Sequence, residues 1–182
     1  MDAHRVTAAI ALLERYGAAE IEHPGGTLLA HLLRVEERLA RWEARPALRL
    51  AGLCHAAYGT DGFPTALMPL GRRAELAEAV GAEAEALVYL YGACDRSASY
   101  PRLAEGAPMT DRFSAEEFVP TKEQRRDFAE LTAANELDLV FASADFARQA
   151  GAGILALLTR FRPLLGDHAW RDRLAAESIV EG

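Results

Sequence analysis

Two histidines are the most informative side chains for chemistry in this sequence. His31 lies in the apolar run LLAHLLRV, and His55 lies in AGLCHAAYGT, which spans residues 51–60. Histidine titrates near neutral pH, so it can exchange a proton or hold a substrate without a metal. Two buried imidazoles on consecutive apolar segments also need hydrogen-bond partners, which predicts a polar pocket inside an apolar wall. We therefore predict that His31 and His55 are catalytic, although either one alone could be a core histidine with satisfied hydrogen bonds.

Predicted helices carry both histidines. Residues 28–43 place leucine, valine and tryptophan on one apolar face, and His31 borders this face three positions after Leu28. Residues 47–59 are apolar on almost every side, which is typical of a helix buried at the centre of a domain. His55 lies near the end of that helix. We expect both imidazoles to point inward.

The rest of the chain also shows the period of amphipathic helices. Residues 97–120 are the exception, because proline, glycine and serine interrupt them and alternating side chains suggest a short β-hairpin near 109–119. We predict an all-α fold in which residues 1–182 form a single helical bundle of about six to eight helices. Besides the two helices above, the predicted ones cover residues 2–17, 72–80, 82–96, 122–143 and 144–163, and a last helix starts near 167.

Composition limits the classes of partner. The chain has 182 residues, 51% of them hydrophobic and 26% charged, with a formal net charge of -7. An acidic surface disfavours nucleic acid and anionic membranes, and no apolar run approaches a membrane span of ~20 residues. With no basic leader at the N-terminus, we expect a cytoplasmic protein whose partner is a small molecule. Cys54 and Cys94 have no motif spacing, and we expect buried free thiols.

Further polar residues are candidates for the same pocket. Tyr58 and Thr60 form a polar corner after His55, and we predict that Tyr58 is catalytic and Thr60 binds substrate. Arg73 could bind a phosphate or carboxylate through its planar guanidinium, or it could be a solvated charge at a helix start. Asp111 and Arg112 lie in the irregular segment, which is a candidate lid.

The helix over residues 122–143 supplies two more predicted substrate-binding residues. Asn135 borders its buried stripe, and Asp138 lies one turn further along. Two other groups receive no role. His23 stands beside a Pro-Gly-Gly turn, where it could line the mouth of a pocket, but we expect it to be exposed to solvent. Asp95 and Arg96 are expected to form a local ion pair at a helix end.

The three motif positions His31, His55 and Asn135 resemble the HD superfamily of metal-dependent phosphohydrolases, which includes alarmone hydrolases. In that family one helix supplies a histidine, the next a His-Asp pair, and a later helix an aspartate. The segment RRAELAEAVGAEAEALVYLY is similar to the corresponding region of alarmone hydrolases, so the resemblance covers roughly residues 25–140. AGLCHAAYGT also looks like the AGLxHxxYGT signature of a bacterial HD-like family. The resemblance implies an HD-like helical fold.

Two departures from the HD pattern bear on the chemistry. Ala56 and Asn135 stand where the family has aspartates that bind the metal. Hard divalent ions need anionic oxygen ligands, so we expect neither a metal nor another cofactor. The favoured function is a small-molecule enzyme that uses its histidines for acid–base chemistry or substrate positioning. Two alternatives stay open: an inactive module that binds a small ligand or a protein, and a metal-dependent hydrolase or oxygenase in which His31 and His55 hold a divalent ion.

Overall fold

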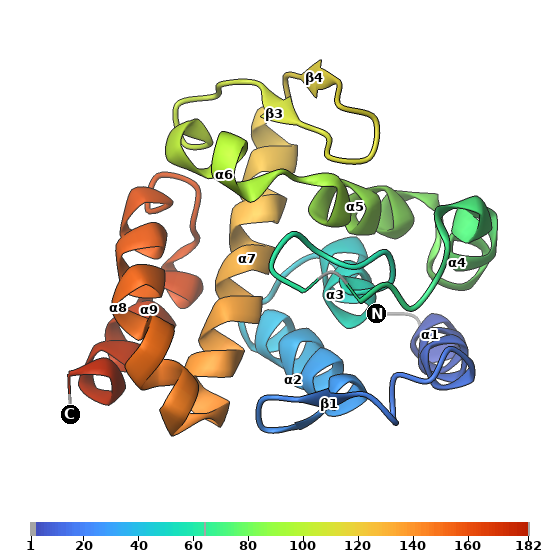
Figure 1. The fold of residues 1–182 in the computed structure, drawn as a ribbon, viewed down its shortest axis with the longest axis horizontal. Coiled ribbons are helices and arrows are strands. Elements are labelled where there is room, and N and C mark those ends of the chain that lie inside the picture. The colour runs from blue at the N-terminus through green and yellow to red at the C-terminus, as the bar shows by residue number, and fades with distance from the viewer. Residues whose placement is uncertain (1–2, 64, 182) are drawn as a thin grey trace.

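Helices account for most of the chain in the computed structural model, which describes residues 3–63 and 65–181. The model is 66% helical, and the prediction of an all-α fold is confirmed. The described residues form nine α-helices (Figure 1): α1 Ala3–Arg15, α2 Leu28–Arg41, α3 Pro46–Cys54, α4 Arg73–Val80, α5 Ala82–Ala93, α6 Arg96–Ser99, α7 Lys122–Ala142, α8 Ala144–Arg160 and α9 Asp167–Val180. Two 3-10 turns cover Leu70–Arg72 and Tyr100–Arg102.

Two small antiparallel hairpins complete the fold. Strand β1, Glu22–His23, pairs with β2, Gly26–Thr27, and β3, Met109–Thr110, pairs with β4, Glu117–Phe118. The second hairpin confirms the prediction near residues 109–119. The first hairpin was expected only as a turn. Its reversal uses Gly25 and Gly26 at φ angles of 81° and 135°, which glycine adopts without steric cost.

Helix α7 forms the centre of the molecule. It packs against α2, α3 and α5 on one side and against α8 and α9 on the other (Figure 1). Buried apolar side chains from α1, the α2–α5 region and α7–α9 form one connected hydrophobic core. Helix α7 consequently buries polar side chains as well, among them Asn135 and Asp138. Within the described part of the chain, none of the helices is both long and apolar enough to span a membrane.

Local signals in the sequence explain several helix boundaries. The Thr27 hydroxyl accepts a hydrogen bond from the Ala30 amide at 3.2 Å, which caps α2 where the sequence predicted. Thr121 and Gln124 form a reciprocal capping box at the start of α7. Gly81 separates α4 from α5 at a φ angle of 92°. These caps fix the register of the helices that carry the polar groups described below.

The helix count exceeds the predicted six to eight because of one short helix. Helix α5 ends at Ala93 rather than near residue 96, since Cys94 forms a β-bridge with Asp111. The Asp95 side chain then accepts a hydrogen bond from the Ala98 amide at 2.9 Å and caps the four-residue helix α6. A side-chain cap and a long-range bridge decide this boundary, and neither is visible in hydrophobic periodicity.

Candidate functional site

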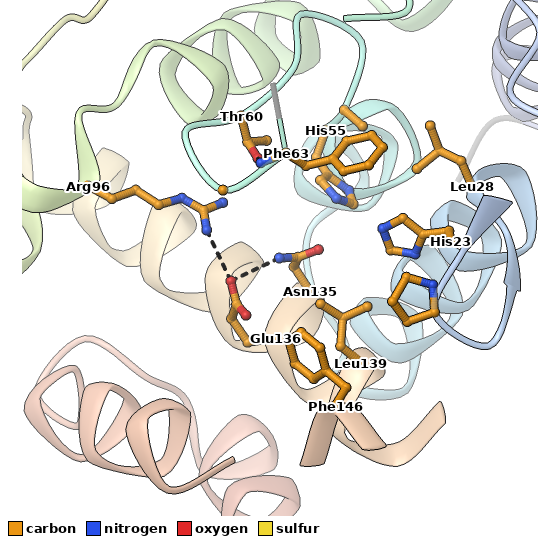
Figure 2. A pocket seen from close by; sticks show the side chains of 13 residues that line it. His23, Leu28, His55, Thr60, Phe63, Arg96, Asn135, Glu136, Leu139 and Phe146 are labelled. Atoms are coloured by element: carbon orange, nitrogen blue, oxygen red, sulfur yellow. Dashed lines mark hydrogen bonds and ion pairs between the residues drawn. The ribbon is translucent and has the colours of Figure 1, made fainter. Parts of the chain in front are cut away.

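A cavity of about 340 Å³ lies between the β1–β2 hairpin, the turn after α3, and helix α7. Figure 2 shows polar side chains from four separate parts of the chain pointing into it. Its polar lining comprises His23, His55, Thr60, Arg96, Asn135 and Glu136, and its apolar lining includes Leu28, Phe63, Leu139 and Phe146. A few convergent polar groups in an apolar wall are typical of small-molecule sites.

His31 lies behind this cavity and is held at both ring nitrogens. Its Nδ1 is 2.7 Å from Oδ2 of Asp138, and its Nε2 is 3.0 Å from Oδ1 of Asn135. The side chain is only 1% exposed. These contacts join α2 to α7 across the core and explain why His31, Asn135 and Asp138 come together although they are distant in sequence.

The two partners of His31 both place oxygen atoms against its ring. Asp138 also accepts hydrogen bonds from Arg34, at 2.9 Å from Nε and 2.8 Å from Nη2. The amide nitrogen of Asn135 donates to Glu136 at 3.1 Å, so the amide oxygen faces His31. Each ring nitrogen of His31 therefore meets an oxygen that can accept a hydrogen bond. Burial acts to raise the pKa of Asp138, but the hydrogen bonds from His31 and Arg34 lower it below its ordinary value.

His55 is held as a neutral imidazole in a single tautomer. Its Nδ1 donates to the Gly52 carbonyl at 2.8 Å, because α3 ends at Cys54 and exposes this carbonyl. Burial lowers the pKa of His55 to about 3, and the nearby charge of His31 acts in the same direction. Nε2 is then a hydrogen-bond acceptor. No hydrogen bond from the described residues reaches it.

His23 belongs to this histidine cluster, which corrects the expectation that it is exposed to solvent. Its ring stacks on His31 with centroids 4.3 Å apart, and His31 in turn meets His55 edge-on at 5.2 Å. The β1–β2 hairpin folds His23 over α2. Burial chiefly lowers the pKa of His23 to about 4, and the neighbouring His31 acts in the same direction to a smaller extent. Its Nδ1 is buried, and no residue in the described part of the chain forms a hydrogen bond with it. The Pro-Gly-Gly turn was the only sequence signal for this placement.

Arg96 is the second residue that the sequence did not assign to the site. Its side chain pairs with Glu136 on α7, with Nη1 at 3.2 Å from Oε1, and its backbone amide donates to Asp61 at 3.0 Å. The expected local pair with Asp95 is wrong, because Asp95 caps α6 instead. Glu136 follows Asn135 directly in α7 and was also missed.

Five of the nine predicted site residues come together. His55, Thr60 and Asn135 line the cavity, and His31 and Asp138 support Asn135 from behind. Thr60 is 5% exposed and forms a β-bridge with Phe63, which shapes the loop at the rim of the cavity.

The other four predicted site residues lie elsewhere. Tyr58 donates to Glu85 at 2.9 Å, and Arg73 pairs with the same carboxylate at 2.6 Å. These three side chains form a separate cluster between the α3 turn, α4 and α5. The structure therefore does not group Tyr58 with the histidines, because its hydroxyl is used by a buried carboxylate.

Asp111 and Arg112 also serve the local structure of the irregular segment. Asp111 accepts hydrogen bonds from the Phe113 amide at 2.7 Å and from the Tyr89 hydroxyl at 2.8 Å. Arg112 donates to the Gly92 carbonyl at 2.6 Å. These contacts hold the β3–β4 hairpin onto α5, and neither residue lines the cavity.

The donor set does not fit the divalent ion that the HD resemblance implies. Asn135 is uncharged, and Ala56 contributes no ligand to the cavity wall. The nearby carboxylates of Asp138 and Glu136 are engaged by Arg34 and Arg96. Among the described residues, no three histidine, cysteine, aspartate or glutamate side chains are grouped so that they could hold a metal. Hard ions need anionic oxygen ligands that these groups do not supply.

One family model matches the N-terminal part of the chain, which supplies the cavity residues that precede α7. Residues 12–96 match the family model described as a domain of unknown function, DUF6817. Comparison with curated proteins and with solved structures yields no match. The matched region is a little under half of the chain. It includes His23, His31, His55 and Arg96, whereas Asn135 and the rest of α7 lie outside it.

Proposed function

We propose that the cavity binds a small organic molecule and that His55 recognises it by accepting a hydrogen bond. The observation that carries this proposal is the fixed tautomer of His55. Its Nδ1 donates to Gly52, and its Nε2 is an acceptor at the wall of the cavity. A bound N–H or O–H group would donate to this acceptor in place of water.

The rest of the lining fits the same role. Thr60, Asn135 and Glu136 offer further polar contacts, while Leu28 and Phe63 provide apolar surface. A volume of about 340 Å³ lies at the lower end of the ~300–1,000 Å³ range of ligand pockets. The expected ligand is therefore small, with an apolar body and at least one hydrogen-bond donor.

Catalysis is the second candidate, and the contact between His31 and His55 favours it. Two imidazoles in contact, one of them held in a single neutral tautomer, can divide proton donation and acceptance between them. His55 by itself is a weak base, because its pKa of about 3 lies far below neutral pH. A bound anion near His55 would raise this pKa and make it a better base. Binding without turnover is therefore the primary proposal.

One screen separates these candidates. A chemically diverse library is tested by thermal shift, and each hit is measured by calorimetry against wild type, His55→Leu and the control His168→Leu, which lies at the start of α9 outside the cavity. Loss of the acceptor should weaken binding about 5- to 100-fold, and the control should bind normally. Mass spectrometry of each incubated hit reports turnover. Absence of any ligand, or binding that is equal in His55→Leu, would refute the proposal.

We also infer that the chain is distantly related to the HD hydrolases and has lost their metal site. The close approach of His31, His55 and Asn135 supports this relationship. The double variant Ala56→Asp/Asn135→Asp restores the two missing carboxylates. It should bind Mn²⁺ in calorimetry much more tightly than wild type does. A folded double variant with no gain in Mn²⁺ affinity would contradict the relationship.

Location in the cytoplasm is a further proposal. Cys54 and Cys94 are both free and buried. Burial raises the pKa of each thiol to about 12, which makes them poor nucleophiles. Free thiols suit a reducing compartment. Fluorescence microscopy of a tagged chain in its native cell would test this.

A further inference from the structure

Arg96 has more hydrogen-bond donors than the surrounding protein satisfies. A guanidinium carries five N–H donors, and this side chain is only 17% exposed. Its Nη1 contacts Glu136 at 3.2 Å and its Nη2 contacts the Tyr91 hydroxyl at 3.3 Å, both at the long end of hydrogen-bond distances. Its Nε is buried and has no hydrogen-bond partner among the described residues. A largely buried guanidinium with unused N–H donors favours binding of a ligand that carries a hydrogen-bond acceptor.

The position of Arg96 directs these donors to the cavity. Its guanidinium lies against the backbone of Gly62, where an added Cβ would be only 2.9 Å from Nη1. The loop after α3 therefore covers one side of the group. Figure 2 shows the guanidinium facing the cavity opposite His55 and Asn135, with Glu136 beside it. A ligand that occupies the cavity would meet Arg96 at one end and His55 at the other.

Arg96 brings a guanidinium to the cavity lining, and Glu136 is its anionic partner there. Arg34 and Asp138 pair with each other behind the cavity, so their charges offset each other. Arg96 carries donors beyond those that Glu136 and the Tyr91 hydroxyl accept, so an anionic ligand can gain further hydrogen bonds from it.

We propose that Arg96 binds an oxyanion of the ligand, either a carboxylate or a phosphate monoester. This proposal rests on the function proposed above, in which the cavity binds a small molecule. The oxyanion accepts hydrogen bonds from the open donors of Arg96, because a guanidinium matches the planar, two-oxygen face of such groups. The apolar body of the ligand lies between Phe63 and Leu28, and a donor on it reaches Nε2 of His55. Glu136 limits the affinity by repelling the anion.

Four probes of similar shape test the charge preference: benzoate, phenyl phosphate, benzamide and benzylammonium. Their affinities are measured by ligand-observed NMR on the full chain. At least one oxyanion should bind about tenfold or more tightly than benzamide, since hydrogen bonds to charged groups are the stronger ones. Preference for benzoate would identify a carboxylate, and preference for phenyl phosphate a phosphate ester.

Two variants tie the preference to the named residues. Arg96→Gln should abolish the advantage of the oxyanions and leave benzamide binding nearly unchanged, whereas the surface control Arg41→Gln should behave as wild type. Glu136→Gln retains an oxygen for Asn135 and removes the repulsion, so it should bind the oxyanion several-fold more tightly. This gain cannot come from an unfolded protein, which guards against a loss of structure in Arg96→Gln.

The outcomes distinguish this proposal from the failure of the proposed function. Benzamide or benzylammonium binding as tightly as the oxyanions would overturn the assignment to Arg96, and so would His55-dependent library hits that include no oxyanion. Both results would leave a small-molecule site in place. If neither the library nor the four probes bind, both proposals fail together.

Discussion

Acidification provides a direct test of how His55 is held. Its pKa falls from an ordinary value of 6.5 to about 3 in the folded chain, chiefly because the ring is buried, and the neighbouring His31 acts in the same direction. Since the folded pKa lies below the unfolded one, the unfolded chain takes up the proton first as the pH falls. The stabilisation is therefore complete above about pH 6.5 and is lost progressively down to about pH 3.

The magnitude follows from the size of this shift. Below pH 6.5 each pH unit removes about 1.4 kcal/mol of stability, so His55 alone accounts for a loss of about 2 kcal/mol between pH 7 and pH 5. At a typical urea dependence of about 2 kcal/mol per molar, the unfolding midpoint moves by about 1 M. His23 acts in the same direction, because its pKa is also lowered.

Urea unfolding followed by circular dichroism at pH 7 and pH 5 measures the effect. The variant His55→Gln should lose about 2 kcal/mol less than wild type over this interval, whatever its stability at pH 7. The variant His4→Gln, at an exposed position in α1, controls for the removal of an imidazole. Equal losses in wild type and His55→Gln would refute the assignment of a buried, neutral His55.

Three further substitutions test the packing and the helix caps by the same urea unfolding assay. Asp138→Asn should lower the free energy of unfolding by about 3 kcal/mol, because it breaks a buried charge cluster. The control Asp145→Asn, in an exposed ion pair, should cost less than about 1 kcal/mol. Equal costs would contradict the buried network. Gly52→Ala should cost about 1–3 kcal/mol of stability, because the added Cβ would lie 2.4 Å from a leucine side chain. Gly153→Ala, whose Cβ would meet no atom of the described residues within 4 Å, should instead stabilise α8 by up to about 1 kcal/mol. The reverse order would show that the packing is misassigned. Thr121→Ala should cost about 1 kcal/mol through loss of the α7 capping box, and no loss would show that the cap is not needed.

The histidine network changes how the resemblance to metal hydrolases is interpreted. In the resemblance, His31 and His55 are metal ligands. Here His31 uses both nitrogens within the protein, and of these two histidines His55 alone lines the cavity. Ala56 and Asn135 offer no carboxylate to the cavity, and Arg96 brings a guanidinium to it. These groups do not supply the anionic oxygen ligands that a divalent cation needs.

Most of the helical fold was predictable from local patterns. Apolar periodicity located the long helices, Thr27 and Thr121 marked the starts of α2 and α7, and alternation located the β3–β4 hairpin. Such signals are readable because a helix cap or an amphipathic face depends on neighbours within a few residues. The exceptions were α6, the β1–β2 hairpin and the end of α3, which was predicted at residue 59 but lies at Cys54, so that His55 follows the helix. The boundaries of α6 and of the hairpin depend on Cys94 meeting Asp111 and on the hairpin folding over α2.

For the candidate site, too, some residues were predictable from the sequence and others were placed only by the tertiary structure. Sequence alone identified His31, His55 and Asn135 as candidates, and the resemblance to HD hydrolases implied carboxylates at the positions of Ala56 and Asn135. Only the tertiary structure brought His23 and Arg96 to the cavity and removed Tyr58 to a cluster with Glu85. The physical reason is that side chains on helices remote in sequence meet through packing, and their hydrogen bonds follow from that packing. The hydrogen bonds of His31 were decided by α7, which supplies Asp138 and Asn135 from more than a hundred residues away.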